Sequence, residues 1–329
     1  MWGNIVRQRS RMIDTINIGR RKRRKKTNMF GKILFLVMLI CILYISINYF
    51  IKEDNIILSD SEINLYINAA DDVSKGKLQV NWKYLAAIDG VRYKKDFSKV
   101  NTENLKELGE NFLKKDGTSS KKDAYKLINL EDMLNKLSFN EKEKEKVHKY
   151  LTELELIGLA SDNLRKDSPY RAFIEELSPK AIELYNKHGI LPSITIGQAI
   201  LESGWGKSDL SVKANNLFGI KADSSWKGES VSMTTSEYYN DVIQDKFRRY
   251  KNKTDSLDDY GKFLVENDRY KKNGLFEATQ YMGQAKALEN AGYSTKQDEN
   301  GNNIYSNLLI NVIKENDLQL IDNKVQSPK

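Results

Sequence analysis

The longest apolar stretch of the chain runs from Ile33 to Ile51 and contains no charged residue. A helix of this length spans about 28 Å at about 1.5 Å per residue, close to the hydrocarbon thickness of a bilayer. Segment 1–29 precedes it and holds ten basic residues and one acid, Asp14. Because positive charge marks the cytoplasmic side of a span, the pattern predicts a basic cytoplasmic tail over 1–29 and a transmembrane anchor over 30–51. The rest of the chain is then expected outside the cell, held at the cell membrane by a single pass.

A cleaved signal peptide is the alternative for this segment. No Ala-x-Ala-like cleavage site follows the span, and the apolar run is longer than the usual core of a signal peptide. We therefore expect an uncleaved anchor that attaches the chain to the lipid bilayer through Ile33–Ile51. The single cysteine, Cys41, falls inside this anchor, so the exported part has neither a disulfide nor a thiol nucleophile.

Residues 52–165 combine apolar positions at helical spacing with charged faces of both signs, which predicts a helical domain. The helical spacing is found in Ile63–Val73, Trp82–Ile88, Leu105–Leu113, Ala124–Leu137 and Val147–Ile157. The sequence assigns this segment no chemistry of its own. We interpret it as a stalk or as a domain for a protein partner.

The run 194–206 is apolar around most of its circumference when it is wound as a helix, which is typical of a helix buried on nearly all sides. Thr195, Gln198 and Glu202 form its one polar strip, and Gly204 provides a stop. The strip is either the solvent face of the helix or the wall of a cleft. In the second case Glu202 is a carboxyl group whose pKa is raised, as a proton donor near neutral pH requires. The pattern alone leaves both interpretations open.

The period of the pattern changes to two after this helix. Alternation over 230–239 predicts a strand, Asn240-Asp241 is typical of a turn, and 246–250 is suited to the returning strand. Glu237 falls on the same face as apolar residues, which favours a carboxylate directed into a groove. A solvated strand residue is the alternative.

Helical spacing dominates the remainder of the C-terminal half, in Phe173–His188, Ser256–Glu266, Gln280–Leu288 and Ile304–Ile313. Ser193 is the predicted N-cap of the buried helix, and Ser256 with Asp259 is the predicted N-terminal box of a later one. The fold class is therefore α+β and mostly helical. We expect one domain over 166–322 with a small β-hairpin lobe, followed by a short tail over 323–329.

The charge of the chain is concentrated at its start. The formal net charge is +8, while segment 1–29 alone carries +9, so the remaining residues sum to about −1. Since the basic cluster leads into a membrane span, we expect no nucleic-acid partner. The only histidines, His148 and His188, lack metal-ligand spacing, and no Gly-rich phosphate loop is present. We expect no metal and no cofactor.

Two sequence blocks in the C-terminal half carry a resemblance. The first is Ala199-Ile200-Leu201-Glu202-Ser203-Gly204-Trp205-Gly206-Lys207-Ser208 and the second is Asn216-Leu217-Phe218-Gly219-Ile220-Lys221-Ala222. In this order and spacing they resemble the bacterial glucosaminidases of glycoside hydrolase family 73, which are lysozyme-like enzymes that cut the glycan strands of peptidoglycan. The similarity runs from about Ser168 to about Leu320.

The resemblance implies roles for individual residues. Glu202 becomes the general acid, and Glu237, within Thr234-Thr235-Ser236-Glu237-Tyr238, becomes the second carboxylate. Tyr293, within Ala291-Gly292-Tyr293-Ser294-Thr295, is expected to reach into the cleft. This sequence departs from the family over Lys296–Asn303, which is longer and polar, so the equivalence of Tyr305 to the family's second tyrosine stays open. The expected substrate contacts are Gln198, Trp205, Phe218, Trp226 and Tyr238.

The resulting expectation is a membrane-anchored endo-β-N-acetylglucosaminidase that cleaves the β-1,4 bond of peptidoglycan glycan strands by general acid catalysis. The alternative is a non-catalytic peptidoglycan-binding or scaffold protein that keeps the lysozyme-like fold. A pure binding protein needs neither Glu202 nor Glu237 to ionise, so their joint presence favours the enzyme.

Overall fold

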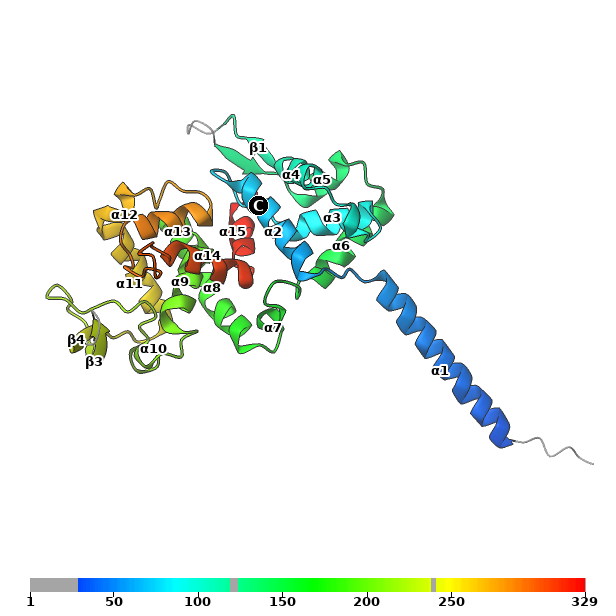
Figure 1. Ribbon diagram of the computed structural model, residues 1–329, viewed down its shortest axis with the longest axis horizontal. Coiled ribbons are helices and arrows are strands. Elements are labelled where there is room, and N and C mark those ends of the chain that lie inside the picture. Colours follow the sequence, from blue (N-terminus) through cyan, green and yellow to red (C-terminus); the bar gives the residue numbers. More distant parts are fainter. Residues whose placement is uncertain (1–28, 119–123, 238–240, 329) are drawn as a thin grey trace, which may run out of the picture. The chain divides into compact units, whose positions relative to one another are not determined.

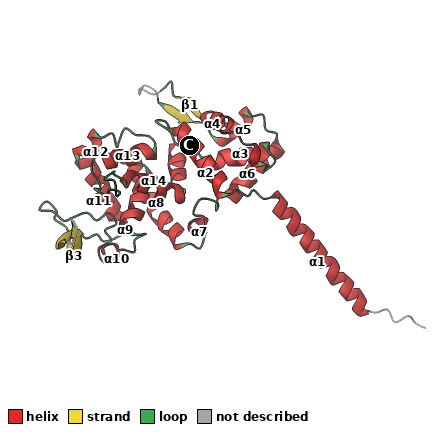
Figure 2. Ribbon diagram, viewed as in Figure 1, coloured by secondary structure: helices red, strands yellow, loops and turns green. Residues whose placement is uncertain are grey.

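The computed structural model describes residues 29–118, 124–237 and 241–328. It divides the chain into two compact units, Met1–Asp54 and Asn55–Lys329 (Figure 1). Helices dominate both units, as Figure 2 shows, and the mostly helical α+β class is confirmed. Residues 1–28 of the predicted basic tail lie outside the described part.

The described residues of the first unit form the helix α1 (Met29–Asp54). Its large apolar side chains from Ile33 to Ile45 are 46–68% exposed. Over the described ranges, none of the helices combines the length and the apolar character that a bilayer crossing requires.

The second unit begins with a helical domain built from α2 (Asp60–Ser74), α3 (Trp82–Arg92), the 3₁₀ turn η1 (Phe97–Lys99), α4 (Thr102–Glu110), α5 (Leu130–Lys136) and α6 (Glu141–Leu154). Its core centres on large buried side chains such as Tyr66, Trp82 and Tyr150. Capping boxes start two of its helices: Ser59 with Glu62 at α2, and Asn140 with Glu143 at α6. The predicted helices of this domain are therefore present, with one exception, although α4 ends three residues before the predicted end at Leu113.

The exception is the segment Ala124–Leu137, for which the prediction of a single helix is wrong in its first part. Residues Tyr125–Leu127 form strand β2, which pairs antiparallel with β1 (Leu113–Lys115). The following helix begins only at Leu130, because the Asn129 side chain accepts a hydrogen bond from the Asp132 amide and caps it. A three-residue pairing leaves too short an alternation for the sequence to reveal.

The C-terminal domain contains α7 (Ser161–Leu164), α8 (Pro169–His188), α9 (Pro192–Ser203), α10 (Asp209–Ala214), β3 (Ser230–Glu237), β4 (Asp241–Arg248), α11 (Lys253–Glu266), α12 (Asp268–Lys272), α13 (Tyr281–Asn290), α14 (Tyr305–Glu315) and α15 (Gln319–Gln326). The strands β3 and β4 pair antiparallel from Ser230↔Arg248 to Glu237↔Asp241, so the predicted hairpin is present. It projects at one edge of this unit in Figure 1.

Helix α9 is the centre of this domain and packs against α8, α13, α14 and α15. Ile194, Ile196 and Ala199 are fully buried in it. Gly197 allows α14 to come close, because a Cβ atom there would lie 2.9 Å from the Leu309 side chain. The helix ends where Gly204 adopts a left-handed conformation with φ of 56°.

Two predicted helix caps are wrong. Helix α9 starts at Pro192, so Ser193 lies in its first turn, where the Ser193 amide and hydroxyl both donate to the carboxylate of Asp322 on α15. Helix α11 starts at Lys253 after the cap Asn252, which places Ser256 inside the helix. In the first case a tertiary contact from a distant helix replaces the local cap.

The helical domain and the C-terminal domain meet through buried polar contacts. The Tyr281 hydroxyl donates to Asp71 at 2.6 Å, and the Trp82 indole donates to Asp317 at 3.0 Å. Lys83 forms an ion pair with the same Asp317 at 2.7 Å. Residues 323–326, which were expected in the tail, continue α15. The described contacts of residues 55–165 thus include the C-terminal domain of the same chain.

Candidate active site

Glu202 is the next-to-last residue of α9 and is followed by the fully buried Ser203. The Tyr305 hydroxyl donates a hydrogen bond to Glu202 Oε1 at 2.8 Å. Burial of the carboxyl raises the pKa of Glu202, while the bond from Tyr305 and the charge of Lys296 act in the lowering direction. The residue as a whole is nevertheless exposed. The raised pKa and the exposure are compatible, because neighbouring atoms surround the carboxyl group on most sides while one side faces solvent.

A chain of hydrogen bonds leads from the core to this carboxyl. The Tyr260 hydroxyl donates to Gln198 Oε1, and Gln198 Nε2 donates to the Tyr305 oxygen at 2.7 Å. Tyr305 in turn uses its own proton for Glu202. Each group therefore has its donor and acceptor roles fixed by the preceding one, and the orientation of the Tyr305 hydroxyl is set.

The polar strip of α9 is not a solvent face, because Thr195 and Gln198 are fully buried. That interpretation is wrong for these two residues. Gln198, an expected substrate contact, lies behind Tyr305 and is absent from the lining of the cleft. Of the three polar residues, only Glu202 reaches the surface.

Glu202 opens onto a cleft of about 380 Å³. Aromatic rings and charged side chains share its wall, in Glu202, Phe218, Gly219, Ile220, Lys221, Asp223, Arg248, Phe263, Arg269, Tyr270, Tyr293 and Ser294. Phe218 lies in this wall and stacks on Tyr260, with ring centroids 4.0 Å apart. Aromatic faces beside a carboxyl group suit a ring-shaped, hydroxyl-bearing ligand.

Tyr293 lies in the same wall as Glu202 and stacks on Tyr305, with centroids 5.3 Å apart and planes at 28°. Burial, and then the neighbouring charge of Glu202, raise the pKa of the Tyr293 hydroxyl far above its ordinary value. The hydroxyl therefore stays protonated and is able to donate a hydrogen bond at neutral pH.

Tyr305 is the residue whose role the sequence left open, and the loop before it explains how the chain reaches this place. The segment Lys296–Asn303 folds back on itself: the Asp298 amide donates to the Asn302 carbonyl at 2.9 Å, and the Ile304 amide donates to the Lys296 carbonyl at 3.2 Å. The additional polar residues form a loop whose two ends pair with each other, at Gln297 and Asn303. The chain after this loop therefore still places Tyr305 beside Glu202.

Asp223 and Arg269 also line the cleft, and sequence reasoning did not single them out. The Asp223 carboxylate accepts from the hydroxyl and the amide of Ser225, and these bonds lower its pKa. It therefore stays ionised in the wall of the cleft that Glu202 also lines. The Asp-Ser-Ser run was the only signal available, and it is equally typical of an ordinary turn.

The remaining expected site residues lie elsewhere. Trp205 packs edge-on against Tyr170 and Phe173 of α8, at 4.7 and 6.0 Å between ring centroids. Trp226 lines a separate cavity and not the cleft of Glu202. Glu237 ends β3, but its side chain, like all of Tyr238, lies outside the described part. Within the described part, no group of three or more His, Cys, Asp or Glu residues is arranged to hold a metal ion.

A comparison with known protein families finds a match for this chain. Residues 178–318 match the Glucosaminidase family, described as mannosyl-glycoprotein endo-beta-N-acetylglucosaminidase. The chain belongs to the glucosaminidase family. The family resemblance inferred from the two sequence blocks is thereby confirmed.

Individual relatives are named as glucosaminidases or peptidoglycan hydrolases. Exo-glucosaminidase LytG of Bacillus subtilis is 39% identical over 158 residues, which are 46% of this chain and 53% of LytG. Peptidoglycan hydrolase FlgJ of Escherichia coli K12 is 34% identical over 171 residues, 50% of this chain and 51% of FlgJ. The solved glycoside hydrolase domain of Salmonella typhimurium FlgJ is 33% identical, over 47% of this chain and 91% of that domain, with a TM-score of 0.37. The chain spans about half the length of the curated relatives it matches.

Proposed function

We propose that the C-terminal domain is a peptidoglycan hydrolase that cleaves the β-1,4 bond of glycan strands as an N-acetylglucosaminidase. The observation that carries the proposal is the Glu202 carboxyl, which lies at the wall of a cleft and whose pKa is raised by burial. The names of the relatives, glucosaminidase and peptidoglycan hydrolase, support the choice of substrate.

Glycoside cleavage needs a proton for the departing oxygen and stabilisation of an oxocarbenium-like transition state. Protonated Glu202 donates the proton. The carboxylate left behind then accepts the hydrogen bond of Tyr305, whose hydroxyl already points at Oε1. Burial thus favours the acid before the transfer, and Tyr305 stabilises the anion after it.

The second carboxylate has two candidates. Glu237 is proposed from the family resemblance, and Asp223 is proposed because it lines the cleft and stays ionised. Attack by the substrate's own N-acetyl group is a third route. Glu237→Gln and Asp223→Asn, each assayed for hydrolysis, distinguish the first two: the catalytic one loses about a hundredfold or more in kcat. If neither variant loses activity, the substrate-assisted route is favoured.

We also propose internal, endo-type cleavage, although one relative is named an exo-enzyme. Mass spectrometry of the products from long glycan strands separates the two modes. Endo cleavage yields fragments of many lengths at early times and GlcNAc at the new reducing end. Release of a single small product from the start contradicts endo cleavage.

The central test is Glu202→Gln, assayed on purified peptidoglycan for new reducing ends. We expect a loss of about a thousandfold, since general acid catalysis contributes two to four orders of magnitude. Glu266→Gln is the matched control, because Glu266 is an exposed carboxylate at the end of α11. Unchanged hydrolysis by Glu202→Gln removes it as the acid. Binding without hydrolysis by the unmodified protein favours the scaffold alternative.

We propose further that the chain is anchored in the cell membrane, with the N-terminus in the cytoplasm and the enzyme facing the wall. The support is the uncharged run Ile33–Ile51 after a basic segment. The pair Leu39→Arg and Leu43→Arg is expected to prevent membrane integration, since each arginine costs about 2.5–3.5 kcal/mol at a span's centre. Ile57→Arg, at another exposed apolar side chain, is the control. Membrane pellets washed with alkali give the readout, and full retention of the double variant would contradict anchoring.

A further inference from the structure

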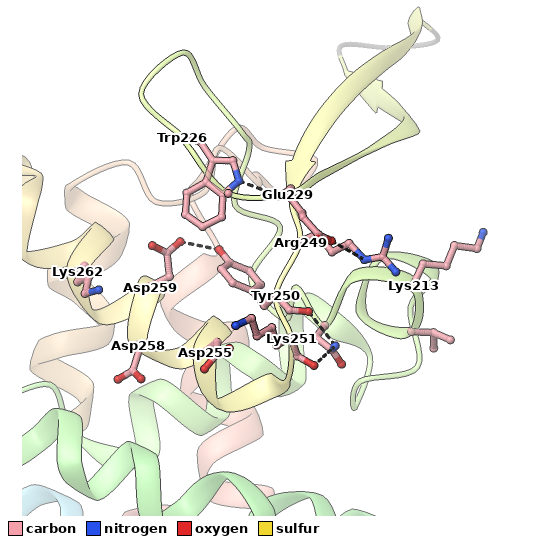
Figure 3. Close-up of a pocket in the computed structure, with 13 residues that line it drawn as sticks. Lys213, Trp226, Glu229, Arg249, Tyr250, Lys251, Asp255, Asp258, Asp259 and Lys262 are labelled. Atoms are coloured by element: carbon pink, nitrogen blue, oxygen red, sulfur yellow. Dashed lines mark hydrogen bonds and ion pairs between the residues drawn. The ribbon is translucent and has the colours of Figure 1, made fainter.

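A second, larger hollow lies next to the cleft of Glu202. Its volume is about 810 Å³, and α10, α11 and the chain on either side of the β3–β4 hairpin surround it (Figure 3). The proposed mechanism does not use it. We name it the lateral cavity, defined by Val212, Lys213, Asn215, Trp226, Gly228, Glu229, Arg249, Tyr250, Lys251, Asp255, Asp258, Asp259 and Lys262.

Two aromatic rings of the lateral cavity are held in place before any ligand arrives. Trp226 and Tyr250 meet edge to face, with centroids 5.9 Å apart. The Tyr250 hydroxyl donates to Asp259 at 2.6 Å, and the Trp226 indole donates to the Glu229 carbonyl at 2.8 Å (Figure 3). Because their polar ends are already bonded, the rings offer apolar contact at little cost in conformational entropy.

The lining of the lateral cavity also holds charges of both signs. Lys251, Lys262 and Asp255 line it, and the side chains of all three lack an ion pair or hydrogen bond within the described part of the chain. Other charged residues of the lining are already paired, such as Asp258, which lies 3.2 Å from Lys180. At the rim the Val212 side chain is 70% exposed. A ligand that fits carries a carboxylate, an ammonium group and small alkyl groups.

One ion pair separates the two hollows. Arg248 lines the cleft of Glu202, Asp259 lines the lateral cavity, and their side chains meet at 2.8 Å. A polymer whose sugar backbone occupies the cleft therefore places its side branches within reach of the lateral cavity. In peptidoglycan these branches are short peptides with alanine methyl groups, free carboxylates and a diamino acid.

We propose that the lateral cavity binds the peptide branch of the glycan strand, and this rests on the proposed function. The carboxylates of the branch pair with Lys251 and Lys262, and its ammonium group pairs with Asp255. A bare sugar fits the site less well, because it lacks an ammonium group that could pair with Asp255. The enzyme is therefore selective for strands that still carry their peptides.

The test compares soluble glycan strands that carry peptides with the same strands after an amidase has removed them. We expect KM to be about fivefold lower for the peptide-bearing strands, as about 1 kcal/mol of ion pairing gives. The double variant Lys251→Glu with Lys262→Glu removes this difference and leaves kcat and the KM for bare strands unchanged. Lys187→Glu, at an exposed lysine of α8, is the matched control and keeps the preference. Far-UV circular dichroism and melting curves verify that the variants fold.

Two results overturn the proposal while the proposed function stands. One is an equal KM of the unmodified enzyme for both substrates. The other is a double variant that weakens binding of both substrates alike, which assigns the lateral cavity to sugar.

If the enzyme hydrolyses neither substrate, the proposed function is contradicted. A binding measurement then tests whether the lateral cavity binds the peptide. The probe is a free tetrapeptide of alanine, γ-linked glutamate and diaminopimelate, followed through the Trp226 indole N–H resonance, which Trp226→Phe assigns. A saturable shift that the double variant loses supports the proposal, and no shift overturns it.

Discussion

The two ends of α9 each meet a carboxyl group, and the two groups are used differently. At the N-terminal end, Asp322 is fully buried and accepts from the amide and the hydroxyl of Ser193. At the C-terminal end, Glu202 accepts one hydrogen bond, from Tyr305, and opens onto the cleft. Burial raises the pKa of both. The fully buried carboxyl of Asp322 stabilises the start of the helix, whereas the carboxyl of Glu202 faces the cleft and is able to exchange its proton with a bound molecule.

The helix dipole adds to this contrast. The N-terminus of a helix favours a negative charge and the C-terminus disfavours it, by about 0.3–1 kcal/mol each. Glu202 therefore lies at the end where a proton is easier to keep. The following predictions test whether the two carboxyl groups are as distinct as their positions indicate.

The largest expected effect is the separation of activity from stability at Glu202. Glu202→Gln lowers kcat by about a thousandfold, while the free energy of unfolding changes by less than about 1 kcal/mol, because the amide keeps the bond from Tyr305. Urea titration beside the hydrolysis assay measures both. A loss of stability as large as that at Asp322 would show that Glu202 is also structural.

Asp322→Ala is expected to show the opposite. Its removal leaves the Ser193 amide buried without an acceptor and reduces the free energy of unfolding by about 3 kcal/mol. Asp268→Ala, at an exposed acid of α12, is the control and changes little. Once folded, Asp322→Ala keeps kcat within about threefold. Equal stability of the two variants in urea would refute the capping role.

Tyr305→Phe is expected to lower kcat by about thirtyfold, because a hydrogen bond to a charged group contributes about 1.5–3 kcal/mol. Without the donor, the pKa of Glu202 rises further, so the acid stays protonated to higher pH. The alkaline limb of the pH profile therefore moves to higher pH. An unmoved limb would mean that Tyr305 acts on the substrate and not on Glu202.

Stability also depends on pH through Asp322. Burial raises its pKa to about 7 in the folded chain, above its ordinary value of 3.8. The folded state thus binds a proton that the unfolded state has lost, so this carboxyl makes stability fall as pH rises from about 4 to about 7, by at most about 1.4 kcal/mol per pH unit. Asp322→Asn is expected to remove this slope in urea midpoints between pH 5 and 7. A slope identical to that of the unmodified protein would assign it to other groups.

The sequence by itself determined much of the local structure. The apolar run 194–206 predicted a buried helix with Glu202 near its end, and Gly204 stops that helix as expected. Alternation predicted the hairpin of β3 and β4. These features depend on neighbours three or four residues apart along the chain, which the pattern of side chains records directly.

Only the tertiary structure decided what surrounds Glu202. Its hydrogen bond to Tyr305 joins residues 103 positions apart, and the cap from Asp322 to Ser193 joins residues 129 positions apart. The local pattern predicted Ser193 as the cap, and Gln198 was an expected substrate contact. Ser193 instead donates to Asp322 on a distant helix, and Gln198 lies buried behind Tyr305. The pattern along the chain indicates which side chains avoid water, but packing decides which distant groups they meet, and those groups set the proton affinity of the Glu202 carboxyl.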